Sequence, residues 1–339
     1  MVQIECPECA ADLNVPASSP IHTCDYCGSA IQISQMIDSG AETGATEDQK
    51  KQFIIQDHYI IRCKYNHDQV KSLLVDWVQK IPGAPQDFEG AANINRIDLK
   101  FYPLWVGEIA ATSDYVGLDD WPRFSKPAHD RPGWYEHVSY YKREESGRVI
   151  REYQVPIMAL DIQKLPKYLR TYNVTTTGKE FFDITHCKKL GGEIVDSIYT
   201  MDQADKMVRQ EALNKQTNEM HKEVKKITSR NDDIQQKGLF YIHFPIYEIS
   251  FNYNGKPHDA LVDGSSGRIV HVKVPVSKEF RVKTLSASAA FGVVGTLMIA
   301  LGSLEYLMFF NIAGGIGLII VALMFLGLNL RKKASERQK

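Results

Sequence analysis

Cys6-Pro-Glu-Cys9 and Cys24-Asp-Tyr-Cys27 form the part of the sequence that decides how the N-terminal end of this chain folds. Each Cys-x-x-Cys turn aims two sulfurs at one point, and 14 residues separate the two turns. This spacing is typical of a closed four-thiolate zinc site, in which no position is left for water or substrate. Gly28, just past the last cysteine, lets the chain turn back under the metal.

This zinc interpretation has two competitors, namely two disulfide bonds in a secreted domain and a redox-active Cys-x-x-Cys. Paired Cys-x-x-Cys turns in a cytosolic chain favour metal over disulfide. We therefore predict a zinc ribbon over residues 1–34 that binds one structural Zn²⁺ and performs no chemistry. Metal binding and folding are expected to be one event in such a module.

The region around these cysteines is acidic. Residues 1–50 contain eight Asp or Glu residues and a single base, Lys50. A ribbon that gripped nucleic acid would need Lys or Arg to displace counterions from the phosphates. The charge therefore disfavours a nucleic-acid partner and favours a protein partner. Residues 35–52 are polar and rich in Gly, Ala and Thr, which predicts a flexible linker with a reach of roughly 20–25 Å.

The C-terminal end is strongly apolar. Residues 285–304 and 307–330 carry no charge, and each stretch is long enough to cross about 30 Å of hydrocarbon as a helix. Only Glu305-Tyr306 separates them, which predicts a tight transmembrane hairpin over residues 284–330. Ser288, Gly292, Thr296 and Ala300 recur every four residues, and this ridge of small side chains favours close approach of the second helix or of another subunit.

Cations flank both open ends of the predicted hairpin: Lys278, Arg281, Lys283, Arg331, Lys332, Lys333, Arg337 and Lys339. By the positive-inside rule both ends face the cytoplasm, with residues 331–339 as a basic tail. No signal peptide is recognisable, because Glu5 and Glu8 interrupt the first apolar residues. We expect a multi-pass cell-membrane protein with two helices and with both termini in the cytoplasm.

The segment between the ribbon and the hairpin has α+β character. Alternating residues predict a strand over 53–65, and Asn66 is a suitable cap for a helix over 67–80. A weak repeat links FYPLW at 101–105 to HFPIY at 243–247, and SGRVI at 146–150 to SGRIV at 266–270. We expect two antiparallel units turned at their Ser-Gly pairs, over residues 53–156 and 239–283, with a further hairpin turn at Asn254-Gly255.

Two other segments of this domain have a distinct composition. The connecting segment 157–238 contains a predicted long helix over 201–230, where Leu213, Met220 and Ile227 fall seven residues apart beside Val224. This stripe packs on its own sheet or forms a coiled coil between subunits. Residues 113–145 are an aromatic insertion, expected as a loop, whose candidate partner contacts are Trp121, Phe124, Trp134 and Tyr135.

Residues that would indicate catalysis are sparse. The sequence lacks a Gly-rich phosphate loop, a Gly-x-Ser-x-Gly elbow and a His-Glu-x-x-His motif. Cys187 stands between His186 and Lys188, which would favour a reactive thiolate, whereas a buried inert thiol is expected for Cys63. His129 and His137 form only a weak metal pattern. We expect no catalytic residues and no enzymatic activity.

Taken together, these motifs resemble those of membrane-tethered zinc-ribbon proteins of bacteria and archaea, of the transcription-factor type. The resemblance is carried by the ribbon, by the helix containing Trp77, by YPLW at 102–105, by the segment from Pro245 to Pro275, and by the apolar hairpin. It spans nearly the whole chain, although the insertion at 113–145 departs from the compact first repeat of such proteins. The resemblance implies architecture and no particular activity.

We therefore expect an α+β protein with an N-terminal zinc ribbon, an antiparallel sheet domain with duplicated hairpin units and a long helix, and a C-terminal transmembrane hairpin. The expected function is that of a non-enzymatic adaptor that presents a cytoplasmic interaction domain to a protein partner at the membrane. Two alternatives remain open, namely a membrane-linked nucleic-acid-associated regulator and an oligomeric structural scaffold.

Overall fold

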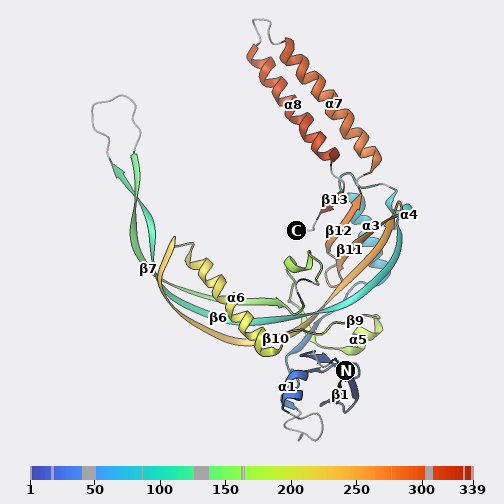
Figure 1. Cartoon of the computed structure of the whole chain (residues 1–339), viewed down its shortest axis with the longest axis vertical. Helices are drawn as coiled ribbons and strands as arrows, with labels where there is room; N and C mark the ends of the chain where they lie inside the picture. The colour runs from blue at the N-terminus through green and yellow to red at the C-terminus, as the bar shows by residue number, and fades with distance from the viewer. Residues whose placement is uncertain are drawn as a thin grey trace. The chain divides into compact units, whose positions relative to one another are not determined.

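The computed structural model is a mixed α+β protein (Figure 1). It describes residues 2–16, 19–39, 51–85, 87–125, 137–161, 163, 165–275, 277–301, 308–330 and 333–336. The chain divides into two units, which we treat separately. Unit 1 comprises Met1–Ile61, Phe101–Lys189 and Ile194–Phe244, and unit 2 comprises Arg62–Lys100, Leu190–Glu193 and Pro245–Lys339.

The N-terminal part of unit 1, which we call the cysteine module (residues 2–39), consists of two small hairpins and a short helix. Its elements are β1 (Val2–Glu5), β2 (Asp12–Val15), β3 (His22–Thr23), β4 (Ala30–Ile31) and α1 (Ile33–Asp38). β1 pairs with β2 and β3 with β4, both antiparallel. α1 covers part of the stretch expected as linker, because Ile33 and Met36 on it are buried among the module's own apolar side chains.

The rest of unit 1 is built on long antiparallel strands. β6 (Asn93–Ser125) pairs with β7 (His137–Met158) in continuous register from Leu104–Met158 to Ser125–His137. β10 (Lys226–Tyr253) lies beside β6, and its residues Tyr241–His243 pair in parallel with β5 (His58–Ile61). Shorter elements complete the unit: η1 (Leu169–Thr171), β8 (Lys179–Phe181), α5 (Ile184–Lys189) and β9 (Glu193–Ile194).

The long helix of unit 1 is shorter than the sequence predicts. α6 (Met201–Met220) begins at a Thr200 capping box, and β10 starts six residues after it ends, so the predicted helix over 201–230 is wrong beyond Met220. The stripe with a seven-residue spacing is also wrong. Ile227 lies in β10, and the side chains that α6 buries recur every four residues: Ala204, Val208, Ala212, Gln216 and Met220.

The predicted loop at 113–145 is replaced by strand. β6 continues to Ser125 and β7 resumes at His137, so most of this segment extends the β6–β7 ribbon. The expected turn at Ser146-Gly147 is wrong for the same reason, because both residues lie inside β7. Gly147 is required there by packing, since a Cβ would come within 2.6 Å of the Tyr115 hydroxyl.

Unit 2 contains the segment whose secondary structure agrees best with the prediction from the sequence. α3 (His67–Lys80) begins at Asn66, whose side chain accepts from the Gln69 amide as part of a capping box. The Asn254-Gly255 turn, with both residues at positive φ, joins β10 to β11 (Lys256–Asp263), and a second turn at 264–267 leads to β12 (Ile269–Pro275). The expected three-stranded meander is therefore present, with α4 (Phe88–Ala91) and β13 (Lys333–Glu336) beside it.

Unit 2 also contains two long apolar helices, α7 (Lys278–Leu301) and α8 (Met308–Leu330), which pack side by side and antiparallel (Figure 1). The Ser288 hydroxyl donates to the Ala322 carbonyl, and a Cβ on Gly295 would lie 2.9 Å from the Gly315 carbonyl oxygen. The two helices therefore approach closely at Gly295 and Gly315, whereas Thr296 of the predicted small-residue ridge is exposed.

Candidate metal centre

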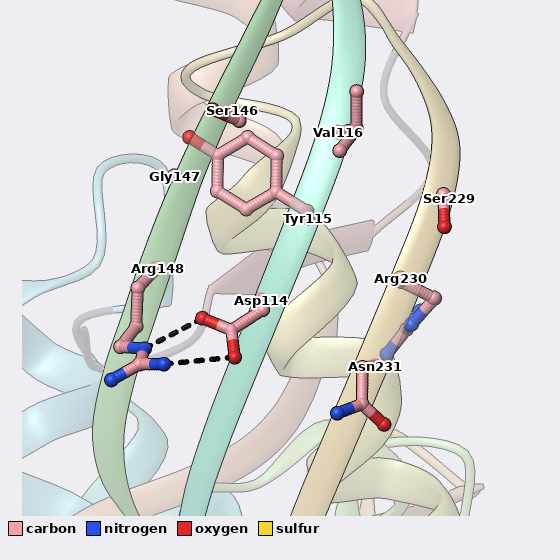
Figure 2. A pocket seen from close by; sticks show the side chains of 9 residues that line it. All are labelled: Asp114, Tyr115, Val116, Ser146, Gly147, Arg148, Ser229, Arg230 and Asn231. Atoms are coloured by element: carbon pink, nitrogen blue, oxygen red, sulfur yellow. Dashed lines mark hydrogen bonds and ion pairs between the residues drawn. The ribbon is translucent and has the colours of Figure 1, made fainter.

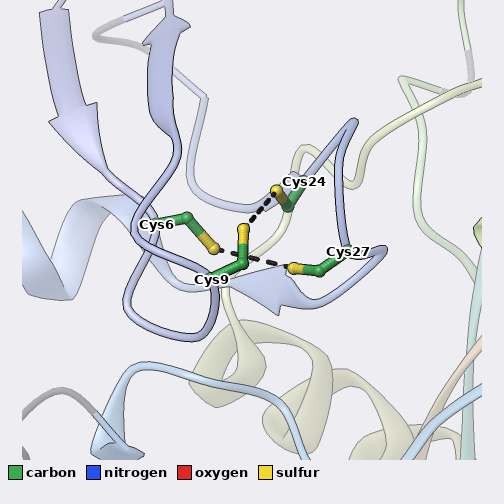
Figure 3. A group of neighbouring side chains, drawn as sticks. All are labelled: Cys6, Cys9, Cys24 and Cys27. Carbon is green, nitrogen blue, oxygen red and sulfur yellow. Dashed lines mark hydrogen bonds between the residues drawn. The ribbon is translucent and has the colours of Figure 1, made fainter.

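Four cysteine sulfurs meet between the two hairpins of the cysteine module (Figure 3). Their Sγ atoms all lie within 4.8 Å of one another, with Cys6 3.7 Å from Cys27 and Cys9 3.8 Å from Cys24. Four thiolates at about 2.3 Å from one zinc ion, arranged as a tetrahedron, would lie about 3.8 Å apart. The sulfurs are too far apart for disulfide bonds, and all four cysteines are free. The donor set fits a four-coordinate metal.

Each hairpin positions its two cysteines by a local turn of the same kind. The Cys6 amide donates to the Ala11 carbonyl at 2.8 Å, and Ala10 adopts a positive φ of 58°. In the second turn the Gly28 amide donates to the Cys24 carbonyl at 2.9 Å, with Gly28 at a φ of 83°. Gly28 adopts this conformation without strain because it has no Cβ, as the sequence predicted, whereas Ala10 adopts it despite its Cβ.

Burial sets the protonation of the cluster in the absence of a cation. Burial raises the pKa of the Cys6 and Cys24 thiols, because a charged sulfur would lose its water. Burial also acts to raise the pKa of Cys27, but hydrogen bonds from Ser29 and neighbouring thiols prevail and lower it to about 7. A divalent cation would release these protons and hold all four groups as thiolates.

The cysteine module rests on the large sheet of unit 1. Ile21 and Ala30 of the module belong to the same cluster of buried side chains as Trp105, Ile109 and Tyr241. The module is therefore packed on unit 1 through its own apolar residues, which differs from the expectation of a ribbon on a free arm. The acidic composition of the module does not prevent this packing, because Ile21 and Ala30 are uncharged.

A polar contact accompanies the apolar one. His22, two residues before Cys24, does not turn toward the sulfurs; its Nδ1 lies 2.8 Å from Asp196 Oδ2, and Asp196 Oδ1 accepts from the Thr23 amide at 2.8 Å. Burial opposes protonation of His22, but the Asp196 carboxylate outweighs it and raises the pKa of the imidazole. His22 therefore attaches the module to the segment before α6.

Two buried histidines lie next to this attachment. His58 Nε2 is 3.0 Å from His243 Nδ1, and His243 Nε2 donates to the Val195 carbonyl at 3.1 Å. Burial lowers the pKa of His58 well below its ordinary value and lowers that of His243 to about 4. Sequence reasoning missed this pair because 185 residues separate the two rings, and neither lies in a recognisable motif.

A second, shallower feature lies on the sheet of unit 1 (Figure 2). It is an open depression of about 500 Å³ across β7, β6 and β10. The Arg148 guanidinium donates to both oxygens of Asp114, at 2.6 and 3.0 Å, and Arg230 and Asn231 stand beside them on β10. The Arg230 guanidinium itself donates to Asp232 and to the Thr217 hydroxyl.

The remaining residues singled out in the sequence are scattered. Trp121 is 39% exposed on β6, and Phe124 lies near the end of the same strand. Trp134, Tyr135 and His129 lie outside the described residues, as do residues 40–50 of the predicted linker, Glu305 and most of the basic tail. Cys187 is fully buried, which blocks the solvent access that a reactive thiolate needs. Cys63 is also buried, and its Sγ lies 3.6 Å from the Tyr247 hydroxyl.

One described helix, Glu279–Ile299 within α7, is long and apolar enough to cross a membrane. α8 contributes a shorter apolar stretch, Gly314–Gly327. Comparisons of this chain with protein-family models, with curated proteins and with solved structures find no match.

Proposed function

We propose that this chain is a membrane-anchored zinc-ribbon protein, whose domain between the ribbon and the apolar helices binds a protein partner at the cytoplasmic face of the bilayer. In this proposal the metal is one structural Zn²⁺, the anchor is α7 with α8, and no residue acts as a catalyst. The arrangement of four sulfurs within 4.8 Å of one another is the observation that carries it.

The zinc assignment is supported by the donor chemistry. Four cysteines and no carboxylate or imidazole make up the cluster, and soft thiolate ligands select zinc over magnesium or calcium. All four positions are taken by the protein, so water has no place in the coordination sphere. The metal would stabilise the module and, through Ile21 and Ala30, its packing on the sheet.

The anchoring is supported by composition and by packing between the helices. Each helix is about as long as the hydrocarbon layer is thick. Their contact uses glycines and an interhelical hydrogen bond from Ser288, which are the means by which helices associate in lipid, where the hydrophobic effect does not drive them together. The cations on both sides favour cytoplasmic ends.

A binding role rather than a catalytic one is supported by the depression on the sheet. Its lining combines an Asp114–Arg148 ion pair with the exposed Asn231 side chain, which offer hydrogen bonds without a nucleophile beside a base. A strand-like or polar segment of a partner protein would suit such a surface.

Topology mapping tests this proposal. A reporter fused after Lys339 should be cytoplasmic, and a Glu305→Cys variant in intact cells should react with an impermeant thiol reagent added outside. The matched control is Ser229→Cys, which should react only after the cells are opened. Release of the chain from membranes by carbonate, or labelling of Ser229→Cys from outside, would refute the proposed anchoring.

A further inference from the structure

The paired ends of β6 and β7 extend as a two-stranded arm beyond the rest of unit 1 (Figure 1). β10 begins at Lys226, beside Gly117, so residues 118–125 and 137–144 have each other as strand neighbours. Three aromatic side chains of this arm are exposed: Trp121 by 39%, Tyr140 by 67% and Tyr141 by 43%. A two-stranded hairpin without a covered face is only marginally stable in water. This indicates that another surface packs against the arm.

One face of the arm combines the aromatic rings with arginines. Trp121 lies directly opposite Tyr141, so both rings stand on the same face of the ribbon. The Arg143 guanidinium lies 4.5 Å from the centre of the Trp121 ring, and the Arg123 guanidinium 5.5 Å from that of Tyr141. This face therefore presents two aromatic rings, each with one arginine guanidinium stacked on it.

The proposed face carries more positive than negative charge. Arg123 and Arg143 lie on it with one carboxylate, that of Asp119, which stands opposite Arg143, whereas Lys142 and Asp120 stand opposite each other on the other face. Trp and Tyr partition to the level of lipid headgroups, and nearby Lys and Arg are attracted to anionic lipids. Nucleic acid suits the face less well, because the guanidiniums already cover ring faces on which bases would stack.

We propose that this face of the arm, made by Trp121, Tyr141, Arg123 and Arg143, binds the surface of an anionic lipid bilayer. It is a second membrane contact, distinct from the apolar helices. The aromatic rings would lie among the headgroups, and the guanidiniums would hydrogen-bond to lipid phosphates. This inference rests on the proposed membrane anchoring, which brings the chain to a bilayer.

The test uses the full-length chain reconstituted into vesicles and an environment-sensitive fluorophore on Ser139→Cys. Ser139 is exposed and lies opposite Arg123 on the proposed face. In vesicles that contain phosphatidylglycerol the label should shift to shorter wavelength and be quenched by brominated lipid. In vesicles of phosphatidylcholine alone, or at high salt, both signals should weaken. The same label on Glu152→Cys, an exposed position on β7 outside the arm, should respond to neither lipid.

A charge variant separates electrostatic binding to anionic lipid from non-specific adsorption to vesicles. Changing Arg123 and Arg143 to Gln should lower the ratio of bound to free arm roughly 25-fold, since each cation near an anionic surface contributes about fivefold. Changing Lys188 and Lys189, two exposed cations on α5, to Gln should leave the ratio unchanged.

The outcomes distinguish this inference from the anchoring itself. If the chain floats with vesicles after a carbonate wash but the Ser139 label stays in water, the arm proposal is wrong and the anchoring stands. If the label is protected only when RNA or another protein is added, the arm proposal is likewise wrong. If the chain fails to float, the anchoring is refuted, and vesicles added from outside then show directly whether the arm binds lipid.

Discussion

Substitution of Gly107 by alanine tests how α6 packs on the sheet of unit 1. Gly107 lies in β6 opposite Val155, and a Cβ there would come within 2.1 Å of Val208 Cγ1 and 3.1 Å of Val208 Cβ. Carbon atoms in contact need about 3.5–4.0 Å. Rotation of the valine cannot relieve the second contact, so the helix must move away from the strand.

The expected cost is large because the site is closed. Val208 is fully buried, and overpacking of a well-packed core typically costs about 1–3 kcal/mol. We expect Gly107→Ala to lower the free energy of unfolding of unit 1 by about 3 kcal/mol. Val208→Ala alone should cost about 2 kcal/mol through two lost methyl groups and the cavity they leave. In the double variant the new methyl group occupies part of that cavity. The destabilisation of the double variant should therefore be about 2 kcal/mol smaller than the sum of the two single destabilisations.

Urea unfolding in detergent micelles, followed by tryptophan fluorescence, measures these quantities, since Trp105 is fully buried in the same cluster. Gly90→Ala serves as the control, because a Cβ there would meet nothing within 4 Å. An unchanged midpoint for Gly107→Ala, or additive costs in the double variant, would refute the packing described here.

Three further predictions concern other parts of the chain. The unfolded chain protonates a histidine at its ordinary pKa, above the value of about 4 that burial imposes on His243, so stability should decline as pH falls from about 6.5 to 4, by up to about 3 kcal/mol. A His243→Gln variant should show a flatter profile in denaturant titrations, and identical profiles would contradict this. Gly295→Val should lower the thermal midpoint of the apolar helices, since a Cβ already meets the Gly315 carbonyl, whereas Gly317→Val should not. Asn66→Ala should cost about 1 kcal/mol in urea titrations through loss of the helix cap, and no change would show that the cap is dispensable.

The parts of the fold that could be predicted are those determined locally. Asn66 and Gln69 form a capping box within four residues, and Asn254-Gly255 supplies the positive φ that its turn requires. The cysteine cluster was likewise predictable, because two short turns carry all four sulfurs. In these cases the residues that determine the conformation are neighbours in the sequence.

The parts that could not be predicted depend on distant partners. The end of α6 at Met220 is one such case, because residues after it pair as strand with β6, about 110 residues earlier. Thr228 donates from its side chain to the Val116 carbonyl, a contact that no helical periodicity reveals. The Ser146-Gly147 pair predicts a turn, yet Gly147 lies in a strand and leaves space for the Tyr115 ring.

The candidate site shows the same division. The sulfurs followed from spacing, whereas the docking of the module did not. The pairing of His22 with Asp196 joins residues 174 apart, and Ile21 belongs to a cluster with side chains from β6, β7, α6 and β10. The polar composition of residues 35–52 predicted a ribbon on a flexible linker. Composition does not reveal that Ile21 and Ala30 of the module pack on the sheet.

The zinc content of the purified full-length chain is a direct test of the proposed four-cysteine metal centre. Metal analysis combined with native mass spectrometry should give one zinc per chain, and Cys27→Ser should abolish it. Cys63→Ser is the matched control, because Cys63 lies outside the cluster and a serine can keep the hydrogen bond to Tyr247. That variant should retain the full metal content. A chain without metal, or one in which Cys6 and Cys9 form disulfide bonds, would contradict the proposed zinc site.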